Sequence, residues 1–278
     1  MLLVASLLAM ALSLAAADSG DAKLRVVTEG PAVQLGATQF VVHSQRVGRE
    51  FLVKVTPPFA PVPAGQTRPV IYALDGGYEV AGPIGWVLGG SGGMAQAWVV
   101  SVGYLPPDYH WRETDLAHVP VVQQNGVADG AGGEAFESFL THELVPFIDS
   151  RFAADPGNAV LFGHSRGGLF AATVFAEHPQ AFRGYIIASA DIRRHPEVLK
   201  AVADAAQSAA GVRVYVAAGA AEPATVTDDE KALFAALTTP GSKATVMSRI
   251  YEGATHASYY PRLVIDAFAW LLPPPNSR

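Results

Sequence analysis

The feature that constrains this chain most is a glycine-flanked serine between an apolar strand pattern and an apolar helix pattern. The segment NAVLFGHSRGGLFAATVF covers residues 158–175, and its centre, from Gly163 to Gly167, has the form G-x-S-x-G. A turn this sharp leaves room only for small residues two positions before and two positions after the serine. The serine then stands at the N-terminus of a helix, where the helix dipole favours developing negative charge. Ser165 is therefore the candidate nucleophile.

Strand patterns and helix patterns alternate along the rest of the chain. Two antiparallel strands are expected between Thr38 and Pro57, in TQFVVHS and REFLVKV. Further strands, several of them continuous apolar runs that are typical of a buried parallel sheet, are expected at residues 69–74, 97–104, 158–163, 183–189, 212–219 and 244–251. Helical spacing covers residues 133–151, 167–177, 227–237 and 260–272. The alternation predicts an α/β three-layer sandwich, whose ligands bind beyond the carboxyl ends of the strands.

Composition excludes several classes of protein. Half of the 278 residues are hydrophobic and only 16% are charged, which excludes intrinsic disorder and predicts a large core. The formal net charge of −6 argues against a general nucleic-acid binder, which needs a basic surface for phosphate. The absence of cysteine excludes a disulfide scaffold, a thiolate metal site and a cysteine nucleophile.

The first segment is interpreted as a secretory signal peptide. Met1–Ala17 is apolar and uncharged, is shorter than the roughly 20 residues of a membrane-spanning helix, and ends in three alanines that suit a cleavage site. A membrane anchor or a buried first helix is the alternative. Cleavage leaves a single catalytic domain over residues 18–278, with no membrane insertion expected afterwards. The protein is then periplasmic or secreted.

A serine nucleophile needs a base, and the base needs an acid to hold it. In a strand–turn–helix fold of this kind the chain order is serine, acid, histidine. Of eight histidines only His256 lies after the last expected strand and before the last helix, so it is the candidate base. Glu222 follows the strand at 212–219 and is the favoured acid. Asp228, Asp229 or no acid at all remain alternatives. No HExxH pair and no cofactor motif occurs, so neither a metal nor a cofactor is expected.

These motifs together resemble an esterase family of α/β-hydrolases. This family includes esterase D, the enterochelin and bacillibactin esterases, feruloyl esterases and the mycolyltransferases. The resemblance covers residues 38–272 and implies the α/β-hydrolase fold with a mostly parallel sheet. It is carried by VIYALDGG and the strand after it, by the helix before the nucleophile, and by the elbow and histidine loop, at residues 70–77, 98–104, 133–152, 163–168 and 253–256.

The resemblance also implies further site residues. The oxyanion hole is expected from the backbone N–H groups of Gly77 and Arg166. Arg112, in WRETDL, resembles an arginine near the site of such enzymes and is a candidate for binding substrate. Arg193 and Arg194 are candidates for binding an anionic catecholate substrate, with a solvated loop as the alternative. Loops are expected to shape the pocket at residues 78–94, where Gly89–Gly93 stands out, and at 106–132 and 191–209.

The function expected from sequence is hydrolysis of a small-molecule carboxylic ester through an acyl-enzyme. The siderophore-esterase branch is the most similar pattern, which makes a trilactone or an aryl ester the expected substrate. An acyltransferase of the mycolyltransferase type would use the same three residues. A non-catalytic binding protein on a hydrolase scaffold is a further alternative, and an exopeptidase is a fourth.

Overall fold

The computed structural model describes most of the chain after the N-terminal segment. Contacts group Gly36–Arg278 into one compact unit. Three sequence expectations lie outside the described residues: the signal peptide Met1–Ala17, the oxyanion residue Gly77 and the arginine pair Arg193 and Arg194. The described residues are 36–75, 80–91, 96–119, 121–122, 128–129, 131–190, 192 and 195–272.

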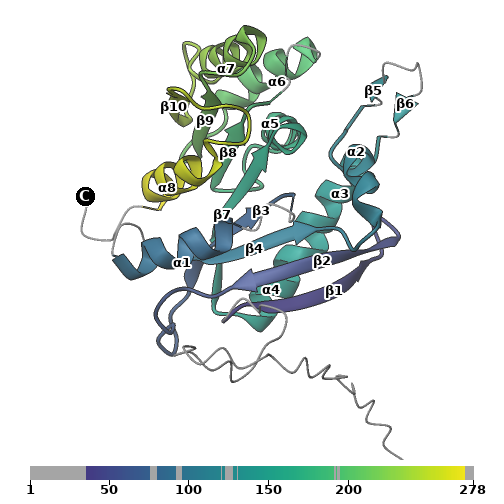
Figure 1. Cartoon of the computed structure of the whole chain (residues 1–278), viewed down its shortest axis with the longest axis vertical. Helices are drawn as coiled ribbons and strands as arrows, with labels where there is room; N and C mark the ends of the chain where they lie inside the picture. The colour runs from purple at the N-terminus through teal and green to yellow at the C-terminus, as the bar shows by residue number, and fades with distance from the viewer. Residues whose placement is uncertain are drawn as a thin grey trace, which may run out of the picture. The chain divides into compact units, whose positions relative to one another are not determined.

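An eight-stranded mixed sheet runs through the fold (Figure 1). Its order is β1-β2-β4-β3-β7-β8-β9-β10; β2 pairs antiparallel with both neighbours, and every pair from β4 onward is parallel. All eight strands were predicted from the sequence. Their bounds are β1 Thr38–Ser44, β2 Arg49–Thr56, β3 Arg68–Ala73, β4 Trp98–Gly103, β7 Ala154–His164, β8 Gly184–Ala188, β9 Arg213–Gly219 and β10 Thr245–Tyr251. A separate hairpin joins β5 (Val121–Val122) to β6 (Ala128–Asp129).

Helices cover both faces of the sheet, which confirms the three-layer α/β architecture. On β3, Val70 and Tyr72 belong to one apolar cluster, while Ile71 and Ala73 belong to the other, as the alternation of a strand requires. The second cluster is closed by α1 (Ala81–Ser91) and α8 (Tyr260–Leu271). The first cluster is closed by α3 (Gly133–Phe139), α4 (Val145–Arg151), α5 (Arg166–Glu177), α6 (Pro196–Ala206) and α7 (Ala224–Leu237). Among the described residues, no helix has the length and apolar character needed to span a bilayer.

The helix α1 corrects the expectation of a glycine-rich loop over residues 78–94. Glycine destabilises an isolated helix, so the sequence AGPIGWVLGGS favours a loop by propensity alone. Tertiary packing overrides that propensity. A Cβ atom on Gly85 would lie 3.0 Å from Val99 Cγ2, and one on Gly90 would lie 2.6 Å from the ring of Phe59. The glycines are therefore the residues that let α1 approach the sheet and its neighbours.

Other helical segments also differ from the sequence expectation. The single helix expected over residues 133–151 is interrupted by a π-helical turn at Leu140–Leu144, next to Pro146, whose missing N–H removes one helix hydrogen bond. The loop expected at 191–209 contains α6, whose buried Val198 and Val202 lie one turn apart. The helix α7 begins at residue 224 rather than 227. The short elements η1 (Asp108–Trp111) and α2 (Arg112–Asp115) were not predicted.

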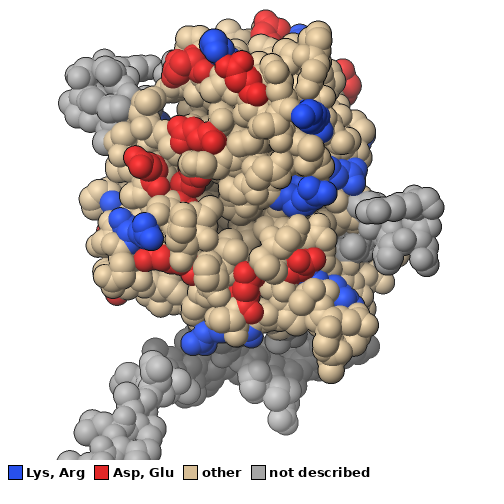
Figure 2. All heavy atoms as spheres, turned by 180° about the vertical axis from the view of Figure 1, so that it is seen from behind, with Lys and Arg blue, Asp and Glu red and all other residues tan. Residues whose placement is uncertain are grey.

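Charged side chains are sparse on the surface. On the face drawn in Figure 2, charged side chains form small groups, some with basic and acidic members side by side, and uncharged surface lies between the groups. This distribution agrees with the charged fraction of 16%.

Candidate active site

The sheet topology brings the predicted catalytic residues to one edge. β3, β7, β8, β9 and β10 are consecutive parallel neighbours, so their carboxyl ends lie side by side. Each of these ends is followed within five residues by a polar side chain that the site uses: Asp75, Ser165, Ser189, Glu222 and His256. Ligand sites in parallel sheets lie at this edge.

Ser165 occupies the sharp turn that the sequence predicted. It links β7 to α5 with φ 60° and ψ −121°, a conformation that L-residues rarely adopt. The flanking glycines are needed for close backbone approach. A Cβ atom on Gly163 would lie 1.8 Å from the carbonyl oxygen of Gly167, and one on Gly168 would lie 2.6 Å from that of Ala188. The elbow is therefore incompatible with larger residues at these positions.

His256 and Glu222 meet as the chain order predicted. The Nδ1 atom of His256 lies 2.6 Å from Oε2 of Glu222. The imidazole side chain is half exposed, whereas the Glu222 side chain is 1% exposed. Because Nδ1 is engaged by the carboxylate, Nε2 is the nitrogen left to exchange a proton with a hydroxyl. Among the described residues no hydrogen bond joins Ser165 Oγ to this ring, and such contacts often tighten only when substrate binds.

Glu222 lies among hydrogen-bond donors. Its Oε1 accepts from the Gly219 N–H and from Ser189 Oγ, each at 2.7 Å. Burial raises the pKa of Glu222, but the hydrogen bonds from His256, Ser189 and Gly219 outweigh burial, so its pKa falls below the usual value. Ser189 also forms a short hydrogen bond with Tyr259. The carboxylate is thus kept ionised and fixed in orientation.

The competing acids lie elsewhere. Asp228 is exposed and pairs with Lys231 at 3.0 Å. Asp229 and Glu230 are buried within α7. Glu230 Oε1 accepts the Ala190 N–H at 2.7 Å, and burial raises the pKa of Glu230 well above its usual value. Of these acids, Glu222 is the one that contacts His256 in the structure.

Sequence reasoning missed two residues that support this pair, Ser189 and Tyr259. The His164 ring is buried against that of His256, with centroids 4.6 Å apart, and its Nε2 donates to the His256 carbonyl at 2.8 Å. Burial lowers the pKa of His164 to about 4, so the ring is neutral at neutral pH. His164 therefore ties the serine elbow to the histidine loop. Only the position of Ser189 at the end of an expected strand could have indicated its role.

A carboxylate–guanidinium network lies beside the elbow. Asp75 follows β3 with φ 58°, and Arg112 binds it through Nε at 2.5 Å and Nη2 at 2.9 Å. Arg112 also lies 3.3 Å from Glu113, which in turn holds the Arg166 side chain at 2.5 Å. A Cβ atom on Gly167 would lie 3.1 Å from Asp75 Oδ2, so the network packs directly on the elbow.

This network bears on two sequence expectations. Arg112 was expected to bind substrate, and the structure engages its guanidinium with two carboxylates of the protein itself. Arg166 was expected to contribute a backbone N–H to the oxyanion hole. It is the first residue of α5, where N–H groups have no acceptor inside the helix. Its side chain, by contrast, is bound to Glu113.

Comparison with known proteins decides the family. The family model described as "Putative esterase" matches residues 44–269. This range is most of the chain, and it includes Ser165, Glu222 and His256. The chain belongs to this esterase family. Family membership makes the protein a hydrolase of esters, in agreement with the site, and confirms the resemblance found in the sequence.

Individual relatives agree with this assignment. The chain is 29% identical to ferri-bacillibactin esterase BesA of Bacillus subtilis over 84% of its own length and 89% of that protein. The fold matches the crystal structure of the BES protein from Bacillus cereus with a TM-score of 0.80 and 24% identity, covering 90% of this chain and 99% of that one. Siderophore hydrolase EstB from Aspergillus nidulans matches with a TM-score of 0.71 and 21% identity, covering 88% and 98%.

Proposed function

We propose that this esterase is a serine hydrolase that cleaves siderophore-type or aryl esters through an acyl-enzyme on Ser165. The observation that carries the proposal is the strained serine at the carboxyl edge of the sheet, together with the His256–Glu222 pair on the neighbouring loops. Nucleophile, base and orienting acid are the three parts that acyl transfer through a serine requires.

The proposed reaction proceeds in two halves. His256 Nε2 takes the proton of Ser165 Oγ as that oxygen attacks the ester carbonyl. The oxyanion accepts a hydrogen bond from the Arg166 N–H, and from the Gly77 N–H as the family resemblance implies. Collapse expels the alcohol, which takes the proton from His256, and leaves an acyl group on Ser165. Water, deprotonated by His256, then releases the acid and restores the serine. Glu222 stabilises the imidazolium in both halves.

A fluorophosphonate probe tests the nucleophile directly. The wild-type protein should be labelled on the peptide that contains Ser165, as identified by mass spectrometry, and S165A should be neither labelled nor active on p-nitrophenyl butyrate. The exposed Ser150, on α4, offers the matched control, since S150A should label as wild type does. Labelling or hydrolysis retained in S165A would contradict the proposal.

The substrate class rests on the relatives, because BesA and EstB are described as acting on siderophores. A panel of ferric and iron-free catecholate trilactones, feruloyl esters and short acyl esters tests it. We expect the highest kcat/KM on a trilactone. Equal activity across the panel would leave a general esterase, and acyl transfer to an added alcohol in preference to water would identify an acyltransferase.

We also propose that the protein is exported, on the basis of the apolar segment Met1–Ala17. The N-terminal sequence of protein recovered from the periplasm or medium should begin at Asp18. Exported protein that still carries Met1 would contradict this proposal and leave the catalytic one untouched.

A further inference from the structure

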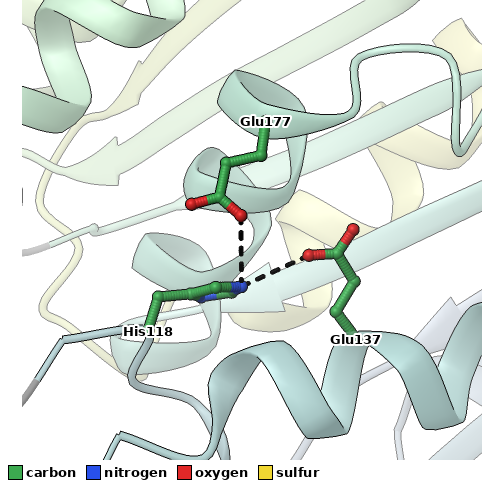
Figure 3. Close-up of side chains that lie close together, drawn as sticks. All are labelled: His118, Glu137 and Glu177. Atoms are coloured by element: carbon green, nitrogen blue, oxygen red, sulfur yellow. Dashed lines mark hydrogen bonds and ion pairs between the residues drawn. The ribbon is translucent and has the colours of Figure 1, made fainter.

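A second histidine–carboxylate cluster lies at the opposite end of the nucleophile helix. His118 comes from the segment that follows α2, Glu137 from α3, and Glu177 is the last residue of α5. Figure 3 shows the imidazole pointing at both carboxylates. Since α5 has 12 residues, Glu177 is about 18 Å along the helix from Ser165. Nothing in the proposed ester hydrolysis uses it.

The spacing of the three groups fits a small divalent cation. Zn²⁺ binds histidine nitrogen and carboxylate oxygen at roughly 2.0–2.2 Å, which places neighbouring tetrahedral ligands about 3.3 Å apart. His118 Nε2 lies 3.3 Å from Glu137 Oε2 and 3.9 Å from Glu177 Oε2. One ligand atom from each residue lies within 4.8 Å of the others. Glu177 is half exposed at a helix end, so a rotamer adjustment closes the remaining distance.

His118 is held in place before any ion binds. Its ring packs against Phe170, with centroids 5.1 Å apart and planes 30° apart. On the other side α3 begins at Gly133, where a Cβ atom would lie 2.7 Å from His118 Nδ1. Glycine at this position allows the ring to sit between α3 and α5. A ligand whose rotamer is fixed by packing loses little entropy on binding.

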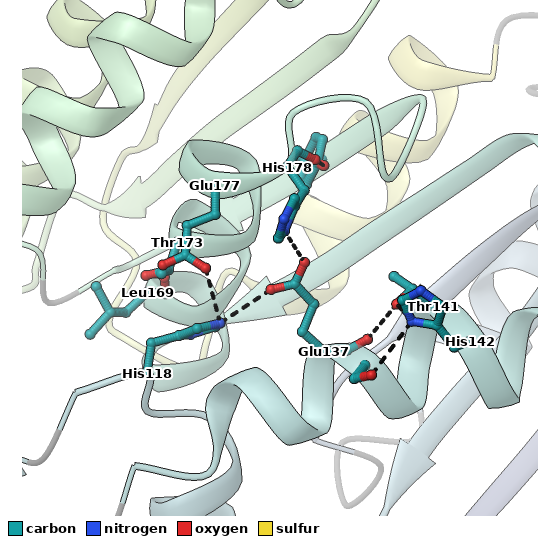
Figure 4. A network of polar contacts seen from close by, with 10 residues as sticks. His118, Glu137, Thr141, His142, Leu169, Thr173, Glu177 and His178 are labelled. Carbon is teal, nitrogen blue, oxygen red and sulfur yellow. Dashed lines mark hydrogen bonds and ion pairs between the residues drawn. The ribbon is translucent and has the colours of Figure 1, made fainter. Parts of the chain in front are cut away.

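A second histidine, His178, holds Glu137 in place. His178 Nδ1 lies 2.7 Å from Glu137 Oε1, so Glu137 bridges two imidazoles (Figure 4). Burial raises the pKa of Glu137, but hydrogen bonds from His118 and His178 outweigh burial and lower it. Glu137 therefore stays ionised although its side chain is only 9% exposed. Hydrogen bonds of this kind to a metal-binding group orient it and raise metal affinity.

In the described part of the chain, the carboxylates of the cluster have histidine partners only. Among the described residues, neither Glu137 nor Glu177 has a lysine or arginine partner. Glu177 also lies at the C-terminus of α5, where the helix dipole disfavours a carboxylate and favours a cation. A cavity of about 230 Å³, lined by His118, Thr173 and Glu177, gives access from solvent and room for a water ligand.

We propose that His118 Nε2, Glu137 and Glu177 bind a divalent transition-metal cation of the zinc type, with a water as the fourth ligand. The imidazole and carboxylate donors suit zinc, nickel or manganese better than calcium, which prefers an all-oxygen shell. On binding, His118 carries its proton on Nδ1 and directs the Nε2 lone pair to the metal. The cation joins the C-terminal end of α5 to α3 and to the segment after α2.

The test uses the full chain, stripped with a chelator and desalted. Titration with Zn²⁺ against a chromophoric chelator should give one ion per chain, and Zn²⁺ should raise the melting temperature. Bound Co²⁺ should show the visible absorption bands of a low-symmetry site. In H118N and E177Q the affinity should fall by about 100-fold or more, and the stabilisation by Zn²⁺ should disappear. The half-exposed Glu177 supplies a variant that folds if H118N does not.

Matched controls separate this site from other zinc ligands. E134Q, one turn before Glu137 on α3, and H142N, on the π-helical turn, should bind Zn²⁺ as wild type does. Wild-type affinity in both H118N and E177Q would overturn the proposal and leave a hydrogen-bonded histidine–glutamate cluster. Loss of zinc binding in H256N alone would place the ion at the other histidine and also overturn it. Hydrolysis of p-nitrophenyl butyrate should be unchanged in E177Q, so the outcome is independent of the proposed catalytic mechanism.

Discussion

The two ends of α5 carry the same residue types in two different arrangements. At the N-terminal end, His256 contacts one glutamate, and the other oxygen of that carboxylate is occupied by Gly219 and Ser189. At the C-terminal end, the single nitrogen His118 Nε2 faces two carboxylates. The helix dipole differs too, since it favours negative charge at Ser165 and positive charge at Glu177.

The comparison shows that the role of each histidine depends on which ring nitrogen the carboxylates contact and on the charges around it. With one orienting acid on Nδ1, the imidazole of His256 retains Nε2 for proton transfer. With two carboxylates near Nε2, His118 donates to Glu137 when no metal is bound, and the proposed cation takes the place of that proton between the three groups. Among the described residues, the non-glycine residues with positive φ are Asp75, Ser165 and Ser189, all at the first end.

Replacing the base should have the largest effect on catalysis. H256N should lower kcat by about 10⁵–10⁶-fold, because no other group takes the Ser165 proton. Steady-state hydrolysis of p-nitrophenyl butyrate measures this, and circular dichroism checks the fold. Zn²⁺ affinity should stay at the wild-type value. A kcat within tenfold of wild type would show that another residue is the base.

Replacing the acid should have a smaller but still large effect. E222Q should lower kcat by about 10³–10⁴-fold, since a neutral amide neither holds the reactive tautomer nor stabilises the imidazolium. D228N is the matched control on the same segment, and its kcat should remain at the wild-type level because Asp228 pairs with Lys231 at the surface. Equal losses in the two variants would contradict the assignment of Glu222.

Arg112 should act by positioning Asp75 rather than by binding substrate. R112K keeps the charge but loses the two-pronged contact with the carboxylate, so kcat should fall by about 10- to 100-fold with little change in KM. The split between kcat and KM is the measurement. A raised KM with an unchanged kcat would instead indicate that Arg112 contacts the substrate.

The smallest expected effect is a loss of folding stability at low pH, to which Glu222 and Glu137 both contribute. Both Glu222 and Glu137 have a pKa lowered below the reference value of 4.5, so each contributes stability that is fully present above about pH 4.5 and is lost as pH falls through the folded-state pKa. Urea unfolding at pH 7 and pH 4 measures the loss. The decrease in the free energy of unfolding between pH 7 and pH 4 should be smaller in both E222Q and E137Q than in the wild type. With saturating Zn²⁺ the loss should grow in wild type, because protonation then also releases the metal, and it should not grow in E137Q.

Local pattern was sufficient for much of the fold. Strand patterns in the sequence predicted every strand of the main sheet. The central strands were predicted from continuous apolar runs, because a parallel sheet is buried on both faces, and β1 and β2 were predicted as an antiparallel pair. The elements missed were those stabilised by tertiary contact. Helix α1 is rich in glycine, and its stability depends on the close approach of Gly85 and Gly90 to neighbouring side chains.

Local sequence was sufficient to predict the elbow around Ser165, because the steric demand for glycine on both sides is a local one. It also determined that Glu222 and His256 follow neighbouring strands, which a parallel sheet brings to one edge. The contacts of Ser189 with Glu222 and of Arg112 with Asp75 depend on long-range packing and became evident from the folded structure. The same holds for the cluster of His118, Glu137 and Glu177, which no local motif marks. These residues are 19 and 40 positions apart on separate segments, and their meeting depends on how α3 and α5 pack.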